Sequence, residues 1–397
     1  ARERLRGARA DSAEIRRLAD RLRALEDTAR QYVVSNEFDE ILTRNGAVGL
    51  NAGTSNDFTV YFFSLPANRA ELWFALESDR MANPVLREFY TERDVVAEER
   101  RLRVETQPAG ILREEFLAAA FKAHPYGWPV VGHMSDIQNL RRPQVLDYFK
   151  RYYGPNNAVV AIVGDVEPEQ MIAWAEKYFG RIPPGEPHTP VVTREPPQPG
   201  ERRVTVEWDA QPQVLFGYHV PEALHADAAP LQMLASVLTA GRTSRLYDRL
   251  VIRERKAAQI NAFFLPGARY PRLLAFSAVP IQPTTAEELE ALVLEEIEKL
   301  KAEPPSEPEL QKIRNQIEAG EYRRLRSNFG IAFQLANSRA LFGDWRETFR
   351  QSARLREVAP EDVSRVAREY LTPQNRTVAT LVPKRRPAEA SSPGRAP

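Results

Sequence analysis

Two glutamates, Glu92 and Glu99, lie seven residues apart in a stretch that is predicted to be one helix. Residues 91–105 contain no glycine or proline and consist mostly of good helix formers, so the helix is expected to be continuous. A separation of seven residues is two helical turns, so both carboxylates project from one face. Such a pair on a rigid helix could bind a cation or hold a general base.

The same stretch allows a second interpretation, a solvated and salt-bridged surface. Glu98 and Glu105 form another pair with the same spacing, rotated by about 100° around the helix. Basic residues lie among the acids and can pair with them three or four residues along the helix: Arg93, Arg100, Arg101 and Arg103. Spacing alone favours the surface interpretation, so the rest of the chain must decide between the two.

The composition is that of an ordinary globular protein. The 397 residues include 43% apolar and 27% charged side chains, which is enough for two or more packed cores. Basic and acidic residues nearly balance, and a net charge of +1 gives no reason to expect nucleic acid or an anionic membrane as a partner. No apolar run reaches the length of a membrane span. The absence of cysteine excludes disulfides and thiolate metal ligands.

The two halves of the chain share a pattern of residues that indicates an internal repeat. Tyr152 and Pro155 in the first half have counterparts at the same spacing in Tyr370 and Pro373. Such a repeat predicts two copies of one α+β unit, each about 200 residues long, as homologous sandwich-type domains. The predicted boundaries are a first domain at 1–180 with a helical excursion at 1–36, a proline-rich linker at 181–202, a second domain at 203–383 and a disordered tail at 384–397.

The repeat also predicts that the first domain is incomplete at its N-terminus. Before Asn261 the second copy carries two predicted strands and a long helix within residues 203–256, whereas the first copy offers only helix before Asn51. A sheet that lacks two strands exposes an unpaired edge and a bare apolar face, which folded proteins avoid. The natural first domain is therefore expected to begin upstream of Ala1. Within the first copy, residues 157–164 are predicted to be a buried strand.

Several segments together resemble the pitrilysin/insulinase family of zinc metallopeptidases, in its processing-peptidase-like bacterial branch. In chain order they are Leu50-Asn-Ala-Gly-Thr-Ser-Asn-Asp-Phe-Thr-Val-Tyr, the helix from Glu92 to Glu99, His124-Pro-Tyr-Gly, residues 153–165 and Gly241-Arg-Thr-Ser-Arg-Leu-Tyr. They cover nearly the whole chain in the order of the family. The resemblance implies a duplicated insulinase-like metallohydrolase fold, α+β in class, whose two domains form a clamshell.

The resemblance also implies roles for individual residues. Family members bind zinc through an inverted His-x-x-Glu-His motif and a distant glutamate, and zinc-activated water attacks the peptide bond. Glu99 matches the distant zinc ligand, and Glu92 matches an auxiliary catalytic acid. Asn51 and Ala52 match a strand that pairs with the substrate backbone. Arg253 matches a substrate-binding arginine of the second domain, although position 260 is Ile where the family often has Tyr.

The chain departs from the family in one respect that decides its chemistry. No His-x-x-Glu-His occurs in it, and no two of its histidines have metal-binding helical spacing: His124, His133, His188, His219 and His225. His124 and His133 are instead predicted to be loop and capping residues. In the family the motif lies just upstream of a helical excursion of this kind, where the repeat predicts two missing strands. Both arguments point to the same absent segment.

Two functions fit these residues. In the first, the chain belongs to a zinc-dependent metalloendopeptidase acting on peptides or unfolded polypeptides, with Zn²⁺ expected for the complete protein and no activity for the chain by itself. In the second, it is a non-catalytic subunit that supplies peptide-binding surface to an active homologue, in a homo- or heterodimer. The presence of both Glu92 and Glu99 favours the first, since a subunit without zinc has no need of them. Relatives of this branch are often exported, so a periplasmic or extracellular location is expected, although no signal peptide is visible.

Overall fold

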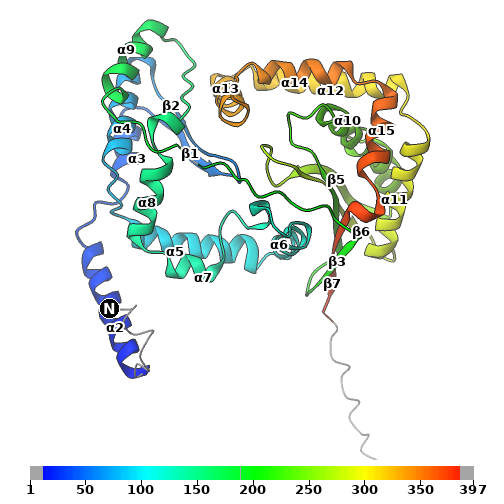
Figure 1. Cartoon of the computed structure of the whole chain (residues 1–397), viewed down its shortest axis with the longest axis horizontal. Helices are drawn as coiled ribbons and strands as arrows, with labels where there is room; N and C mark the ends of the chain where they lie inside the picture. The colour runs from blue at the N-terminus through cyan, green and yellow to red at the C-terminus, as the bar shows by residue number, and fades with distance from the viewer. Residues whose placement is uncertain (1–11, 188, 385–397) are drawn as a thin grey trace, which may run out of the picture.

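The computed structural model describes residues 12–187 and 189–384, and its mixture of helices and sheet confirms the predicted α+β class. Figure 1 shows the first half (residues 12–180) and the second half (residues 203–384) joined by a segment whose described residues form neither helix nor strand. Most of the predicted tail and the start of the predicted helical excursion lie outside the described residues. The first half contains α2 (Ser12–Arg30), α3 (Glu37–Arg44), β1 (Val48–Thr54), β2 (Thr59–Ser64), α4 (Ala70–Ala82), α5 (Phe89–Arg100), α6 (Pro108–Ala120), α7 (Met134–Asn139), α8 (Arg142–Tyr152) and α9 (Pro168–Phe179).

The second half is built on one five-stranded sheet. The strand order is β3-β7-β4-β6-β5, in which β3 and β7 run parallel and all other neighbours run antiparallel. Its elements are β3 (Arg202–Trp208), β4 (Gln213–Val220), α10 (Ala228–Thr239), a π-helical segment (Tyr247–Arg253), β5 (Ala257–Leu265), β6 (Arg272–Pro280), α11 (Ala286–Ala302), α12 (Glu307–Arg324), α13 (Asn328–Phe342), α14 (Glu347–Glu357), α15 (Pro360–Tyr370) and β7 (Arg376–Pro383). Helix α14 has one buried apolar residue, Leu355.

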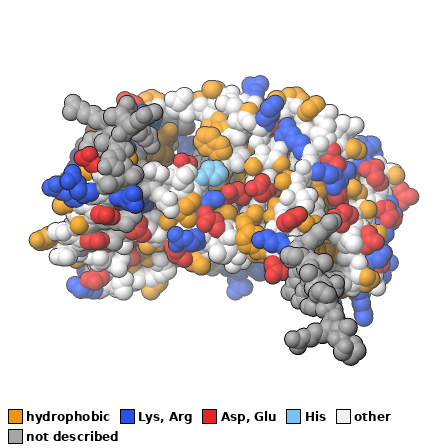
Figure 2. Space-filling view, turned by 90° about the horizontal axis from the view of Figure 1, so that it is seen from below, with side chains coloured by type: hydrophobic (Ala, Val, Ile, Leu, Met, Phe, Trp, Pro, Cys, Tyr) orange, Lys and Arg blue, Asp and Glu red, His pale blue; other side chains and the backbone are white. Residues whose placement is uncertain are grey.

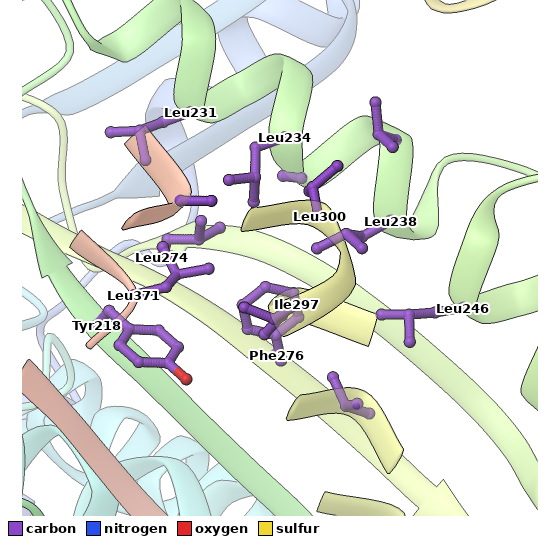
Figure 3. Packing of buried hydrophobic residues seen from close by; sticks show 14 of the residues in the cluster. Tyr218, Leu231, Leu234, Leu238, Leu246, Leu274, Phe276, Ile297, Leu300 and Leu371 are labelled. Carbon is purple, nitrogen blue, oxygen red and sulfur yellow. The ribbon is translucent and has the colours of Figure 1, made fainter. Parts of the chain in front are cut away.

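One face of this sheet packs against α10, α11 and α15. Phe216 of β4 and Phe276 of β6 are fully buried and stack with their ring centroids 5.2 Å apart. Burying each side chain of this size contributes about 1.5–3 kcal/mol. Figure 3 shows Phe276 together with helix and strand residues of the same cluster: Leu231, Leu234, Leu238, Leu274, Ile297 and Leu300.

The opposite face of the same sheet is covered by a helix of the first half, α6, which lies beside β3 and β7 in Figure 1. Leu112, Phe116 and Ala120 recur every four residues along α6 and are fully buried. A Cβ on Gly217 of β4 would lie 3.1 Å from Cζ of Phe116, so this ring rests directly on the strand backbone. The two halves therefore share a core. Its strand residues include Val206, Leu215, Leu273, Ala275 and Leu381.

The predicted repeat is visible in detail after α8 and α15. A short 3₁₀ turn follows each helix. Nδ2 of Asn157 donates a hydrogen bond to the carbonyl oxygen of Tyr152 at 2.9 Å, and Nδ2 of Asn375 donates to that of Tyr370 at 2.8 Å. Residues at equivalent positions thus form the same local structure in both halves.

The prediction of a buried strand at 157–164 is wrong. The segment pairs with no strand of the described chain, and Val159, Val160 and Ile162 are 40%, 51% and 37% exposed. Its counterpart in the repeat is β7, which lies between β3 and β4. The described part of the first half has only β1 and β2, which pair antiparallel with each other. The apolar pattern is strand-like, but no described strand lies beside the segment to bury it.

Candidate metal-ligand and peptide-binding site

Glu92 and Glu99 lie on α5 in a regular α-helical segment that ends at Arg100. Glu92 is exposed, whereas Glu99 is partly shielded. Oε1 of Glu99 lies 2.8 Å from Nη1 of Arg103 in the following turn. An exposed ion pair of this kind contributes at most about 1 kcal/mol, so a metal ion could displace the arginine at little cost.

Arg100 is buried and anchors the end of α5. Its guanidinium donates two hydrogen bonds of 3.0 Å to the carboxylate of Glu114 on α6, and one of 2.7 Å to the carbonyl oxygen of Gly132. The bonds with Glu114 raise the pKa of Arg100 further above its usual range. Because a bidentate pair has a fixed geometry, it sets the orientation of α5 against α6. The directions in which Glu92 and Glu99 point are set with it.

The second predicted pair, Glu98 and Glu105, is not aligned. Residues 101–105 form a π-helical turn, which takes Glu105 out of the α-helical register with Glu98. Glu98 pairs with Arg101 at 2.5 Å, and Glu105 pairs with Arg100 at 3.2 Å. For these two acids the salt-bridged surface is therefore the correct interpretation.

The strand β1 pairs with β2 on one side, and its other edge is open within the described structure. Asn51 lies opposite Phe62, and Ala52 lies opposite Tyr61. Oδ1 of Asn51 accepts a hydrogen bond of 2.8 Å from the backbone N–H of Ala52. Rotation of the Asn51 side chain would free this amide. An exposed edge with available backbone groups is what an added strand requires.

Contacts from both halves hold the β1–β2 hairpin in place. Phe62 packs against Phe329 of α13, with 4.8 Å between ring centroids. The hydroxyls of Tyr61 and Tyr153 lie 2.9 Å apart, and burial together with this bond raises the pKa of Tyr61 well above its usual range. The hairpin is thus a bridge between the halves.

Arg253 lies at the end of the π-helical segment of the second half and is largely exposed. Its Nε lies 2.8 Å from Oδ2 of Asp248. Ile260, seven residues further on, is 1% exposed and belongs to the core. The position of the family's tyrosine is therefore used for packing in this chain.

The histidines that the structure describes do not complete a metal site with Glu99. His124 caps the 3₁₀ turn Pro125–Gly127 through Nδ1, and His133 precedes α7, which confirms their predicted loop and capping positions. Nε2 of His219 lies 3.0 Å from the carbonyl oxygen of Ala120. Burial lowers the pKa values of His124 and His219.

His188 lies outside the described residues. Across residues 12–187 and 189–384, no group of three or more His, Asp or Glu side chains could hold a metal ion. The described residues therefore do not fit a catalytic zinc by themselves, because such a site takes three protein ligands.

Asp57 and Tyr126 had no predicted role, yet the structure brings them together. The hydroxyl of Tyr126 donates a hydrogen bond of 2.5 Å to Oδ1 of Asp57. Both residues lie in segments that carried the family resemblance. That resemblance was the signal in the sequence that could have marked them as functional.

The surface shows no gathering of one charge on the face seen in Figure 2, where acidic and basic side chains are interspersed. This agrees with the nearly balanced charge of the sequence. Among the helices that the structure describes, none is both long enough and apolar enough to cross a membrane.

Both halves of the chain combine helices with a sheet, and Glu92 and Glu99 share one helix of the first half. The sequence model for Insulinase (Peptidase family M16) matches residues 20–133, and that for the Peptidase M16 inactive domain matches residues 139–317. The chain belongs to the M16 (insulinase) family of peptidases.

Relatives of this chain are similar over most of its length. The zinc protease PqqE of Helicobacter pylori is 30% identical over 378 residues, which cover 92% of this chain and 83% of that protein. The crystal structure of a protease from Helicobacter pylori superimposes with a TM-score of 0.83 at 31% identity, covering 89% of this chain and 86% of that one. Mitochondrial core protein I of the ubiquinol-cytochrome-c reductase complex of Euglena gracilis is 27% identical over 233 residues, 55% of this chain and 45% of that protein.

Proposed function

We propose that this chain is the greater part of a zinc-dependent metalloendopeptidase that hydrolyses peptides or unfolded polypeptides. Glu99 is the zinc ligand that the chain contributes, and Glu92 supports catalysis as an auxiliary acid. Asn51 and Ala52 pair with the substrate backbone. The observation that carries the proposal is that Glu92 and Glu99 share one regular helix, whose orientation is fixed by the buried Arg100.

The proposal requires a further segment that supplies the imidazole ligands, because one carboxylate cannot hold a catalytic zinc. The unpaired segment 158–163 of the first half supports the existence of such a segment. Residues 158–163 occupy the place of β7 in the repeat, and β7 is paired on both sides, with β3 and β4. Two strands that precede Ala1 would bury the exposed Val159, Val160 and Ile162 in the same way.

Three further assignments belong to this proposal. Arg253 reaches the substrate from the second half after leaving Asp248. The domains keep the predicted boundaries at 1–180 and 203–383, with α6 of the first packed on the sheet of the second. The protein acts outside the cytoplasm, in the periplasm or beyond, as the family resemblance suggests.

A second candidate is a non-catalytic subunit that supplies peptide-binding surface to an active homologue, in a homo- or heterodimer. Two observations favour it: the described residues do not form a zinc site, and core protein I, a relative, is a component of a larger complex. In this alternative Asn51 and Ala52 still bind peptide, whereas Glu99 has no metal to bind.

The upstream reading frame separates the two candidates. A His-x-x-Glu-His motif encoded within some tens of codons before Ala1 would support the peptidase. The protein produced with that segment is expected to cleave reduced, carboxymethylated α-lactalbumin, an unfolded polypeptide, and to lose this activity with 1,10-phenanthroline. Its Glu92→Gln variant is expected to retain zinc and lose most activity.

The opposite results would identify the subunit. A natural start without the motif, or binding of the polypeptide without cleavage by the zinc-supplemented protein, contradicts the peptidase proposal.

A further inference from the structure

One carboxylate, that of Asp57 in the turn between β1 and β2, joins three turns from the two halves of the chain. Its Oδ1 accepts a hydrogen bond of 2.5 Å from the hydroxyl of Tyr126, in the 3₁₀ turn that follows α6. Its Oδ2 accepts the backbone N–H groups of Ala268 at 2.6 Å and Arg269 at 3.3 Å, between β5 and β6. A hairpin of the first half is thus bonded directly to a hairpin of the second.

The packing around this carboxylate leaves no free space. A Cβ added to Gly267 would lie 2.2 Å from Oη of Tyr126 and 2.6 Å from Oδ2 of Asp57, so only glycine allows this close approach. The backbone N–H of Tyr270 donates to the same hydroxyl at 3.3 Å. Burial and the bond to Asp57 raise the pKa of Tyr126 well above its usual range. The hydroxyl therefore stays protonated at neutral pH and remains a donor.

The turn that carries Tyr126 is also fixed by the segment joining the two halves. The carboxylate of Glu195 accepts three backbone N–H groups, at 2.7, 2.8 and 3.0 Å, from Lys122, Ala123 and His124. Burial alone would raise the pKa of Glu195, but these bonds hold it below its usual range. Nδ1 of His124 in turn accepts the N–H of Tyr126 at 3.1 Å. The tyrosine is therefore held in position for its bond to the β1–β2 turn.

The β1–β2 hairpin depends on such anchors, because an isolated two-stranded hairpin is marginally stable at best. Two of its anchors lead to the second half: the bonds of Asp57 at its turn, and the contact of Phe62 with Phe329. The second half therefore helps to set the direction of the open edge at Asn51 and Ala52.

We propose that Asp57 and Tyr126 are positioning residues that hold the β1–β2 hairpin at a fixed angle to the second half, so that an extended peptide added to β1 lies across both halves. The proposal rests on the proposed function in one respect, that β1 is the peptide-binding edge. It gives a role to the Asn56-Asp57 turn and to the His124-Pro-Tyr-Gly loop, which the zinc site does not use.

Spin labels test this positioning in the chain as it stands. The chain contains no cysteine, so Val48→Cys on β1 and Tyr322→Cys on α12, both at well-exposed positions, accept two labels for double electron–electron resonance. Tyr126→Phe is expected to broaden or shift the distance distribution between the labels. The matched control is Tyr370→Phe, which removes a tyrosine–aspartate bond of 2.7 Å to Asp227 inside the second half. It is expected to leave the distribution unchanged.

A second variant keeps the test decisive if Tyr126→Phe fails to fold. Asp57→Ala removes the carboxylate that accepts the hydrogen bonds from Tyr126, Ala268 and Arg269. It is expected to broaden the distribution in the same way. If the Tyr126 and Asp57 variants fold and give the same distance distribution as Tyr370→Phe, the proposal is overturned.

Kinetics supply a readout that a merely structural contact would not change. In the protein with its upstream segment, Tyr126→Phe is expected to raise KM for reduced, carboxymethylated α-lactalbumin about three- to tenfold and to change kcat by less than about twofold. A fall in kcat at unchanged KM would overturn the positioning role. Absence of hydrolysis by the parent protein would overturn the proposed function instead, and the label distances would still decide whether Asp57 and Tyr126 fix the hairpin.

Discussion

The carboxylate of Glu99 pairs with the guanidinium of Arg103, its Oε1 lying 2.8 Å from Nη1. Arg103 belongs to the π-helical turn that continues α5, and 77% of its side chain is exposed. The pair is weak and reversible for that reason. Glu99 is thus held on a rigid helix with a partner that a cation could replace.

Zinc content tests Glu99 against a neighbouring glutamate. In the protein with its upstream segment, Glu99→Gln is expected to weaken zinc binding by about 100-fold or more, because even partners of zinc ligands contribute about 10- to 100-fold. Glu98→Gln is the control, since Glu98 is exposed and paired with Arg101. Metal analysis after dialysis measures both. Equal zinc in the two variants would rule Glu99 out as a ligand.

Hydrogen exchange tests the open sheet of the first half. We expect the amides of residues 159–163 to exchange rapidly in the chain as it stands, because no described strand pairs with them. Residues 377–381 of β7, their counterparts in the repeat, are paired on both sides and are expected to be protected. With the upstream segment present, both segments should be protected. Protection of 159–163 without that segment would contradict the structure of the first half.

Stability measurements test the core shared by the two halves. Phe116→Ala on α6 is expected to lower the free energy of unfolding by about 3–5 kcal/mol, because a large side chain is removed from a fully buried site. Faster exchange is expected in β3 and β7, on which α6 packs. Phe349→Ala, at a half-exposed position, is the control and should change stability by less than about 1 kcal/mol. Urea denaturation measures the free energy of unfolding of both variants. Equal losses in the two variants would contradict the shared core.

The ion pair between Glu309 and Arg245 predicts a pH dependence. Arg245 donates to both carboxylate oxygens of Glu309, at 2.9 and 3.1 Å, and these bonds lower the pKa of Glu309 from 4.5 to about 2. A carboxylate with a lowered pKa in the folded protein stabilises it above the unfolded value of 4.5. That contribution is lost as the pH falls toward about 2.

Glu309→Gln is therefore expected to cost about 1 kcal/mol at neutral pH and nothing near pH 2. Denaturation of the parent and the variant across this pH range measures the difference. Glu318→Gln is the control, since its nearest cation, on Arg356, lies 3.8 Å away. A cost for Glu309→Gln that does not depend on pH would contradict the assignment.

Local signals in the sequence determined many of the elements. The helices α9 (Pro168–Phe179) and α10 (Ala228–Thr239) follow from patterns of this kind. Proline at the start of the first and a dense apolar run in the second act within a few residues of the chain. The placement of Glu92 and Glu99 on one helix follows from the same short-range geometry.

The tertiary structure alone decided which surfaces are buried. Residues 157–164 have the apolar pattern of a buried strand but are exposed, because burial depends on neighbours that a local pattern does not contain. Phe116 could be recognised as a core residue but not as part of the core of the other half. Asp57 and Tyr126 are 69 residues apart, and only the packing of three turns brings their oxygens together. Periodicity is a property of neighbouring residues, whereas these contacts depend on how distant segments fold against one another.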